Sequence, residues 1–314
     1  MNEIYCYAWD YNILIQTNDE QIVHDLYKIQ DVGGIPVLFQ DKCLYKENIS
    51  LYILDSSEKT EFVQNGTKFY LYLDLKNGIR YDCLRNLIGQ FVSVAAIING
   101  EYPLHSAALK IEKKGILLLG DSGAGKTILS IYLCNRENAY WLSNDWSAIT
   151  LKKVDEVDRY VAITKGYDMI SIRKQSLAHI TPYITLQEAT FLQNACFEEK
   201  KIFEIQMLNI KKGSLPTKIS NIYIICINND LPYCVTQLSY DEAYSLLKKE
   251  MTWVVAGINS TLYNKNNCII LDKVVVDVIP SDLDEVIADI YRNIKIMKIT
   301  GNVKTVGKYI RRQI

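Results

Sequence analysis

The chain has 314 residues, of which 49% are hydrophobic, and its formal net charge at pH 7 is -1. This apolar fraction suffices for a buried core, and the length suits one large domain or two modest ones. The near-neutral charge gives no global reason to expect nucleic acid or an anionic membrane as a partner.

Three further features narrow the class of protein. We expect no spanning helix, because no apolar run reaches the roughly 18 residues that one needs. The first residues lack the basic and apolar regions of a secretory signal peptide. The eight cysteines and three histidines show no metal-ligand spacing such as C-x-x-C. We therefore expect reduced thiols, no zinc site and a cytoplasmic location.

The first part of the chain is predicted to be mainly β. Short β-branched or aromatic runs indicate strands at 4–9, 13–16, 35–39, 51–54 and 68–75. Turns are expected at Gly33-Gly34, Asn65-Gly66 and Asn77-Gly78, and a short helix over 18–30 with Asn18 as its cap. These patterns predict a mainly β module over residues 1–80 and a second domain over 81–314.

The second domain is predicted to open with a helix and a hairpin. Apolar residues recur at helical spacing over 81–98, and Asn99-Gly100 ends the pattern. Two short strands follow, at 104–111 and 116–119, joined by a polar turn over 112–115. A hairpin makes the second strand antiparallel to the first. This departs from the plain βαβ arrangement of most phosphate-loop proteins.

Residues 115–127 read Gly-Ile-Leu-Leu-Leu-Gly-Asp-Ser-Gly-Ala-Gly-Lys-Thr and match the pattern G-x-x-x-x-G-K-[ST]. An apolar strand precedes the loop, and a helical pattern with apolar positions at 128, 129, 131 and 133 follows it. A glycine-rich turn that matches by coincidence is the alternative interpretation. The agreement of strand, loop and helix favours a phosphate-binding site.

The residue types of this loop suit phosphate chemistry. Glycines allow successive backbone N–H groups to surround an anion at a helix N-terminus. Lys126 can place a positive charge on the outer phosphates, and the Thr127 hydroxyl can bind Mg²⁺. The residues predicted to bind the nucleotide are Gly120, Asp121, Ser122, Gly123, Ala124, Gly125, Lys126, Thr127 and Ile128.

Three segments together resemble a known family. They are Leu-His-Ser-Ala-Ala at 104–108, the phosphate loop itself, and Trp-Leu-Ser-Asn-Asp-Trp at 141–146. They resemble the HPr kinase/phosphorylase catalytic domain, whose fold is shared with phosphoenolpyruvate carboxykinase. Related kinases are encoded beside ribosomally made peptides, such as lasso peptides. The resemblance implies an α/β (α+β) phosphate-loop domain of this type behind the mainly β N-terminal module.

The resemblance also assigns candidate roles to residues. His105 matches the active-site histidine of the family, Lys126 and Thr127 match its loop lysine and metal-binding hydroxyl, and Asp145 matches the second, metal-binding Asp of a pair. Asn144 stands where the family usually has the first Asp, the residue commonly assigned as the base. Asparagine cannot accept that proton, so either His105 or Asp145 takes the role, or the acceptor differs, or transfer is weak.

Each of these residues also has a plain structural interpretation. Asp145 can be a turn residue, His105 a packed and hydrogen-bonded histidine, and Asn144 a strand-end cap. Arg173 ends a segment, 166–173, that is similar to the one after the Asp pair in the family. It can reach a transferring phosphate, but a solvated surface position is the simpler expectation.

The last third of the chain carries fewer signals. An apolar run at 222–227 predicts a central strand, and Ser239 with Glu242 forms a capping box that opens a helix. A helix is expected over 185–197, a solvated charge run at 198–201, a strand at 269–278 and a last helix from Ser281. The residues from 291 to the end are basic without an acidic one, so a solvated tail is the default expectation. The alternative is contact with an acidic peptide or another subunit.

The resemblance implies ATP- and Mg²⁺-dependent phosphorylation of a hydroxyl on a protein or a ribosomally made peptide. The alternatives are nucleotidyl transfer or carboxykinase-like chemistry in the same pocket, and a non-catalytic nucleotide-binding module in which Asn144 marks lost chemistry. No nucleic acid or membrane partner is expected. The acceptor, a reverse phosphorylase activity and homo-oligomer formation stay open.

Overall fold

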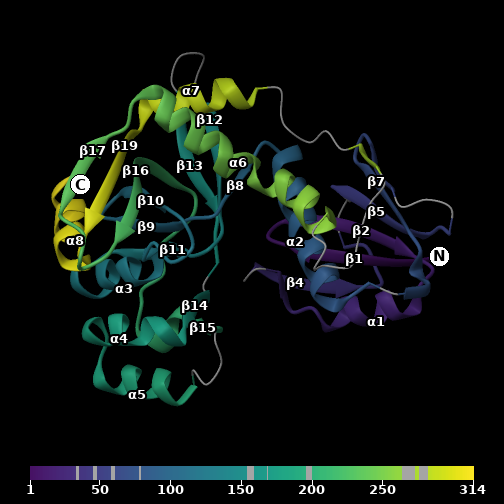
Figure 1. Ribbon diagram of the computed structural model, residues 1–314, viewed down its shortest axis with the longest axis horizontal. Helices are drawn as coiled ribbons and strands as arrows, with labels where there is room; N and C mark the ends of the chain where they lie inside the picture. The colour runs from purple at the N-terminus through teal and green to yellow at the C-terminus, as the bar shows by residue number, and fades with distance from the viewer. Residues whose placement is uncertain are drawn as a thin grey trace. The chain divides into compact units, whose positions relative to one another are not determined.

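The computed structural model describes residues 1–32, 35–44, 48–57, 61–77, 79–153, 159–167, 169–195, 200–263, 273–275 and 282–314. Its elements form a mixed α/β protein with several sheets (Figure 1). Contacts divide the chain into two compact units, Met1–Tyr102 with Glu250–Ser281, and Pro103–Lys249 with Asp282–Ile314. The predicted ranges meet instead at 80/81. Helix α6 (Tyr240–Tyr263) contains the residues where the chain passes from the second unit back to the first.

The first unit is built on one sheet, in the order β18-β6-β7-β5-β2-β1-β4-β3 among the described strands. Both parallel and antiparallel pairs occur: β1 and β2 are antiparallel, whereas β2 and β5 are parallel. The strands are β1 (Asn2–Ala8), β2 (Tyr11–Thr17), β3 (Asp31–Val32), β4 (Ile35–Gln40), β5 (Ile49–Asp55), β6 (Glu61–Asn65), β7 (Lys68–Leu73) and β18 (Lys273–Val275).

Two helices pack with this sheet. Helix α1 (Glu20–Lys28) is capped by Asp19, whose side chain accepts a hydrogen bond from the Ile22 amide, and not by Asn18 as predicted. Helix α2 (Tyr81–Ile98) has the predicted bounds and a broad buried stripe. Its Phe91 ring meets Phe62 and Phe69 edge to face at centroid distances of 5.9 and 5.1 Å. The helix therefore buries apolar surface against its own unit's sheet.

The second unit has a branched sheet in the order β11-β9-β10-β16-β13-β12-β8 among the described strands, with β19 attached at β16 and β17 at β19. Strand β16 is central, as predicted: its start pairs with β13, and its later residues pair with β10 and β19. The strands are β8 (Tyr102–Leu104), β9 (Ala107–Ile111), β10 (Lys114–Leu119), β11 (Tyr140–Ser143), β12 (Ser147–Lys153), β13 (Arg159–Lys165), β16 (Thr217–Ile227), β17 (Cys234–Gln237) and β19 (Lys295–Gly301).

Helices α3 and α8 pack against each other beside this sheet (Figure 1). A separate ribbon, β14 (Met169–Arg173) with β15 (Lys200–Glu204), contributes to the same core. The helices of the unit are α3 (Lys126–Arg136), α4 (Leu177–Ile180), α5 (Leu186–Ala195), α7 (Leu283–Asn293), α8 (Val303–Arg312) and the first part of α6. The Ser239–Glu242 capping box at the start of α6 is confirmed by hydrogen bonds in both directions.

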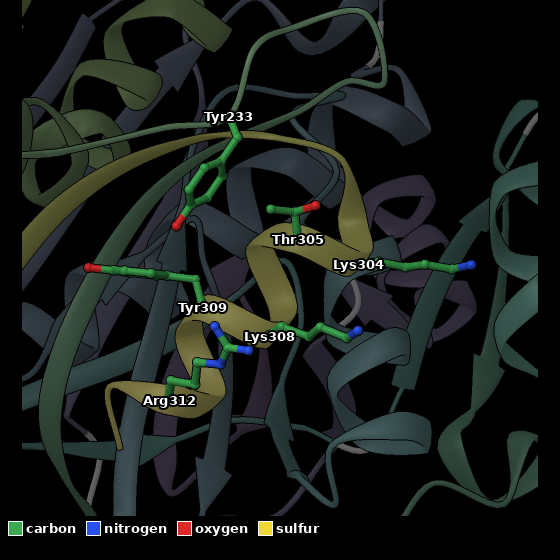
Figure 2. Close-up of a pocket in the computed structure, with 6 residues that line it drawn as sticks. All are labelled: Tyr233, Lys304, Thr305, Lys308, Tyr309 and Arg312. Atoms are coloured by element: carbon green, nitrogen blue, oxygen red, sulfur yellow. The ribbon is translucent and has the colours of Figure 1, made fainter.

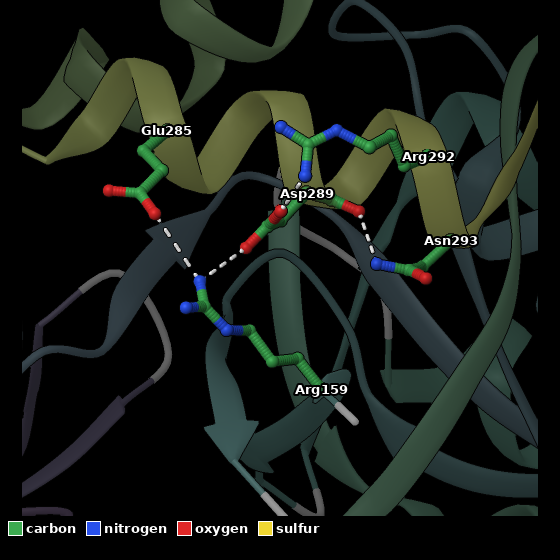
Figure 3. Close-up of polar contacts among 5 residues, drawn as sticks. All are labelled: Arg159, Glu285, Asp289, Arg292 and Asn293. Carbon is green, nitrogen blue, oxygen red and sulfur yellow. Dashed lines mark hydrogen bonds and ion pairs between the residues drawn. The ribbon is translucent and has the colours of Figure 1, made fainter. Parts of the chain in front are cut away.

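An ion-pair cluster joins α7 to the start of β13 (Figure 3). Asp289 is 3% exposed, and its two carboxylate oxygens pair with Arg159 and Arg292 at 3.0 and 2.6 Å. Burying a carboxylate is costly unless cations and hydrogen bonds compensate it, and these two guanidinium groups do so. The cluster thus fixes α7 on the sheet of its own unit.

The predicted β-hairpin is confirmed: β9 and β10 are antiparallel, and Ala107 pairs with Leu118. The turn consists of Glu112 and Lys113, with Glu112 at φ 56°, and Gly115 lies inside β10 instead of ending the turn. A Cβ at Gly115 would lie 2.8 Å from the carbonyl oxygen of Lys218. This glycine therefore permits the close pairing of β10 with β16.

The expectation of a solvated basic tail is wrong. Residues 295–301 form β19, which pairs with both β16 and β17, and residues 303–312 form α8. The residues of this segment that are buried include Ile296, Ile299, Val303, Val306 and Ile310. The expected last helix, α7, is thus followed by another strand and another helix.

Some predictions fall on residues outside the described ones. They are the turns at Gly33-Gly34 and Gly78, the acidic part of the 198–201 charge run, the helix start at Ser281 and most of the 269–278 strand. The described part of that strand is β18, which pairs in parallel with β6. Among the described residues, no helix combines the length and apolar character needed to cross a bilayer.

Candidate nucleotide site

The sheet of the second unit brings the three predicted segments to one edge. Strands β10 and β11 are each antiparallel to β9, so they run parallel to each other, and β16 is parallel to β10. The residues that follow Leu119, Ser143 and Ile227 therefore lie at the same edge as the residues that precede Ala107. The carboxyl ends of parallel strands are the usual place for a ligand in open α/β sheets.

The loop between β10 and α3 adopts backbone angles that require glycine. Gly120, Gly123 and Gly125 have φ values of 147°, 87° and 90°. At Gly125, a Cβ would also lie 2.6 Å from Cβ of Ile227, at the end of β16. The Ile227 amide donates to the Ala124 carbonyl at 2.9 Å. The loop is thus held against β16 by contacts that the sequence pattern alone does not reveal.

The loop leaves backbone donors available. Asp121, Ser122 and Gly123 are exposed, and Ala124 and Gly125 are partly exposed. The Ala124 amide donates to the Asp121 carbonyl, closing a turn. Within the described chain, the amides of Asp121, Ser122, Gly123 and Gly125 have no hydrogen-bond acceptor. Unengaged N–H groups before a helix N-terminus form a site for anions.

Lys126 crosses the loop. Its side chain is buried, at 6% exposure, and its ammonium Nζ donates to the carbonyls of Gly120 at 2.6 Å and Asp121 at 3.3 Å. The positive charge is therefore fixed next to the loop backbone and does not extend into solvent. Ile128, the last residue of the predicted nucleotide set, packs partly buried on the apolar core.

Thr127 and Asn144 are in direct contact. The Thr127 hydroxyl donates to Oδ1 of Asn144 at 3.0 Å, which joins the first turn of α3 to the end of β11. Asn144 is fully buried, and its Nδ2 has no hydrogen-bond partner among the described residues. A buried amide donor without a partner is costly, so this nitrogen is an observation that a bound group would explain.

His105 and Asp145 are the other two residues with a predicted catalytic role. Ala107, the first residue of β9, pairs with Leu118 near the end of β10, and His105 lies two residues earlier, in the bend between β8 and β9. Asp145 follows Asn144, is partly exposed and has φ 66°, a conformation that few non-glycine residues adopt. Both residues thus lie beside strand ends at the loop's edge of the sheet, His105 before β9 and Asp145 after β11.

Arg173 contacts the loop directly. It ends β14, and its Nη2 donates to the Ser122 hydroxyl at 3.2 Å. The guanidinium group is exposed, in keeping with the simpler expectation, yet it adds a second cation beside the phosphate loop. The resemblance suggests that Arg173 can reach a phosphate, and this contact agrees with that alternative, whereas the loop motif itself says nothing of Arg173.

Sequence reasoning did not single out two serines at this edge. Ser106 follows His105, and Ser147 opens β12, two residues after Asp145. Both are fully buried, and neither hydroxyl has a hydrogen-bond partner among the described residues. Ser106 lies inside the 104–108 motif and Ser147 directly follows the 141–146 motif, and this closeness to the quoted residues is the signal that the sequence offers.

The residues fit Mg²⁺ in part. Among the described residues there is no cluster of three His, Cys, Asp or Glu side chains that would hold a metal alone. Mg²⁺ is commonly held by one or two protein oxygens together with substrate phosphates. Thr127 supplies a hydroxyl oxygen and Asp145 a carboxylate at the same edge, so this donor set suits a nucleotide-bound Mg²⁺ and not a free-standing metal site.

Comparisons with known proteins give matches among solved structures alone. No protein family description matches the chain, and no curated protein does. Among solved structures, the HPr(Ser) kinase/phosphatase from Coxiella burnetii matches with 11% identity and a TM-score of 0.27, covering 67% of this chain and 91% of that chain. At such a TM-score, the functional argument depends on the residues of the site themselves.

Proposed function

We propose that the chain is an ATP- and Mg²⁺-dependent kinase that transfers the γ-phosphate of ATP to a hydroxyl of a protein or peptide. The observation that carries the proposal is the loop at 120–125, which combines left-handed glycines, unengaged amides and a buried lysine ammonium at the start of a helix. Such a loop binds the phosphates of a nucleotide through backbone N–H groups and one point charge.

The residues at the sheet edge suit phosphoryl transfer. The loop amides and Lys126 bind the phosphates, Thr127 and Asp145 hold the metal, and a bound Mg²⁺ supplies charge neutralisation of the phosphate oxygens. The acceptor oxygen forms a bond to the γ-phosphorus as the bond to the ADP oxygen breaks, and His105 accepts the hydroxyl proton. Arg173 lies beside the loop, where it can stabilise charge on the transferring group.

We expect Asn144 to affect the rate of phosphoryl transfer and not the binding of ATP. Its Oδ1 accepts from Thr127, so the amide occupies the position from which an Asp would face the metal. Positioning and charge neutralisation supply most of the catalysis in phosphoryl transfer. Loss of one carboxylate is therefore expected to slow transfer without abolishing it.

The test is binding followed by transfer. Calorimetric titration of the full chain with ATP and MgCl₂ should show saturable binding, and Lys126→Ala should weaken it at least about tenfold. Label from γ-³²P-ATP should reach an acceptor peptide, whereas label from α-³²P-ATP should not. Incorporation from the α position would indicate nucleotidyl transfer, and unchanged binding by the Lys126 variant would place the site elsewhere.

One observation favours a second candidate function, a nucleotide-binding module without transfer. The neutral Asn144 leaves Asp145 as the single carboxylate among the residues proposed to hold the metal. Asn144→Asp separates the two cases. A module that has lost its chemistry should gain activity by this change, whereas a kinase that already uses Asn144 should lose activity because a buried charge disturbs Thr127.

A further inference from the structure

The surface of α8 forms a basic groove that is not lined by residues of the phosphate loop. Its lining consists of Tyr233, Lys304, Thr305, Lys308, Tyr309 and Arg312, and it encloses about 230 Å³ (Figure 2). Lys304 and Lys308 extend to the same side of the helix in this view, and Tyr233 lies across from them. We refer to these six residues as the α8 groove.

The three cationic side chains of the α8 groove form no ion pairs with the rest of the described chain. Lys304, Lys308 and Arg312 are exposed, and none has an ion-pair partner among the described residues. Arg311 of the same helix, in contrast, pairs with Glu112 at 2.8 Å. The opposite side of α8 is buried, because a Cβ at Gly307 would already lie 2.3 Å from the ring of Tyr132. One side of the helix thus stabilises the core and the other presents charge.

The spacing of the cations along α8 matches the spacing of side chains on one face of an extended peptide. Residues four apart on a helix are about 6 Å apart along its axis, and side chains on one face of an extended peptide recur about every 6.6 Å. Acidic side chains at alternate positions of a peptide can therefore meet Lys304, Lys308 and Arg312 in turn. The enclosed volume of about 230 Å³ is smaller than a typical small-molecule pocket, which favours side chains as the occupants.

We propose that the α8 groove binds an extended peptide segment with Asp or Glu at alternate positions. Tyr233 and Tyr309, whose rings meet at a centroid distance of 6.3 Å, form an apolar wall beside the cations and can pack against the peptide's aliphatic stems. A nucleic acid is disfavoured because the chain has a net charge of -1 and lacks the broad basic field of such proteins.

The location links the groove to the loop. Gly301, which precedes α8, pairs with Ile227, and Ile227 contacts Gly125 of the phosphate loop. A peptide that leaves the groove on the Gly301 side would reach the phosphate site, where it would present its hydroxyl. This last step depends on the proposed kinase function, whereas the binding of the peptide does not.

The experiment measures binding without ATP. Fluorescence anisotropy of labelled Ser-Glu-Ser-Glu-Ser-Glu-Ser with the full chain should show saturable binding that weakens with added NaCl, and the matched peptide with Gln for Glu should not bind. The double variant Lys304→Gln/Lys308→Gln should bind the acidic peptide about tenfold more weakly. The control Lys211→Gln/Lys249→Gln removes two exposed lysines outside the groove and should bind like wild type.

Several outcomes would overturn the proposal. They are no binding by wild type, equal binding of the Glu and Gln peptides, or an equal loss in the control variant. Displacement of the peptide by single-stranded RNA or inorganic phosphate at lower concentration than by unlabelled peptide would instead assign the groove to those anions. Lys126→Ala should bind the peptide normally, so a failure of the kinase proposal stays distinguishable from a failure of this one.

Discussion

At the scale of single residues, the phosphate loop depends on glycines for two separable reasons. Gly123 and Gly125 share nearly the same φ, 87° and 90°, but differ in their surroundings. A Cβ at Gly123 would meet no atom within 4 Å, whereas one at Gly125 would lie 2.6 Å from Cβ of Ile227. The pair therefore separates backbone strain from steric overlap.

Gly123→Ala should lower the free energy of unfolding by about 1 to 2 kcal/mol, from left-handed strain alone. Gly125→Ala should lower it by about 2 to 4 kcal/mol, since overlap with β16 is added. Chemical denaturation of both variants measures the difference. The added Ile227→Gly change, which removes the overlapping Cβ, should recover part of the Gly125→Ala loss and none of the Gly123→Ala loss. Equal losses for the two glycine variants would contradict this account.

Asp25 illustrates a residue whose charge stabilises its helix. Its carboxylate accepts hydrogen bonds from Gln21 at 3.0 Å and from Lys28 at 2.7 Å, and these partners lower its pKa. Because the pKa is lower in the folded state than in the unfolded state, the stabilisation is present above about pH 4 and is lost as pH falls below it.

Asp25→Asn should therefore destabilise the protein by about 1 kcal/mol at pH 7, and the difference from wild type should shrink as pH falls below about 4. Thermal unfolding at several pH values measures this. Asp82→Asn is the matched control, because the Asp82 side chain is 74% exposed and lies 3.8 Å from Arg80. A difference from wild type that persists at low pH would show that Asp25 acts through packing and not through charge.

At the scale of elements, α8 is fitted to α3 more closely than helix propensity would favour. Gly307 lies in mid-helix, and a Cβ there would be 2.3 Å from the Tyr132 ring. That ring is held from other sides, because its hydroxyl donates to Glu137 at 3.0 Å and Tyr183 packs edge to face with it. The glycine lets the two helices approach.

Gly307→Ala should thus destabilise the protein by about 1 to 3 kcal/mol, although alanine gains about 1 kcal/mol in helix propensity. In a Tyr132→Leu background the same change should be neutral or stabilising, because the ring is gone. A double-mutant cycle on thermal or chemical unfolding gives the coupling between the two positions. A stabilising Gly307→Ala in the wild-type background would show that the helices are free to separate.

Local patterns predicted local structure well. The hairpin before the loop, the Ser239 capping box and the α2 bounds all follow from residues close in sequence. The sequence does not predict strand β19, because the basic residues of this segment indicate a solvated tail and mask the apolar residues of a strand. Lys295 and Lys298 are exposed, whereas Ile296 and Ile299 are buried. A short strand that contains exposed lysines has the same sequence pattern as a solvated tail. Only its pairing with neighbouring strands distinguishes the two.

In the candidate site, too, the sequence predicts the local structure but not the long-range contacts. The motif predicts the loop itself, because its glycines and lysine are contiguous in sequence. The contacts of Arg173 with Ser122 and of Ile227 with Gly125 join residues far apart in the chain, and they depend on which strands become neighbours. Such long-range contacts are set by sheet order, which a local pattern does not encode.

At the scale of the whole molecule, each unit is completed by residues distant in sequence. Strand β18 returns to pair with β6 in the first unit, and β19 with α8 completes the second. Strand β19 lies between β16 and β17, so it is an interior strand of its sheet. The C-terminal segment is therefore part of the fold that holds the phosphate loop.

Deletion of residues 295–314 should consequently prevent the second unit from folding. The segment buries Ile296, Ile299, Val306 and Ile310, and each buried aliphatic side chain contributes about 1.5 to 3 kcal/mol. Their sum is comparable with the whole stability of a domain, about 5 to 15 kcal/mol. Deletion of only Gln313 and Ile314 is the control, and it should leave the unfolding transition and ATP binding nearly unchanged. If the longer deletion also kept a cooperative transition and ATP binding, the segment would be dispensable, as a solvated tail would be.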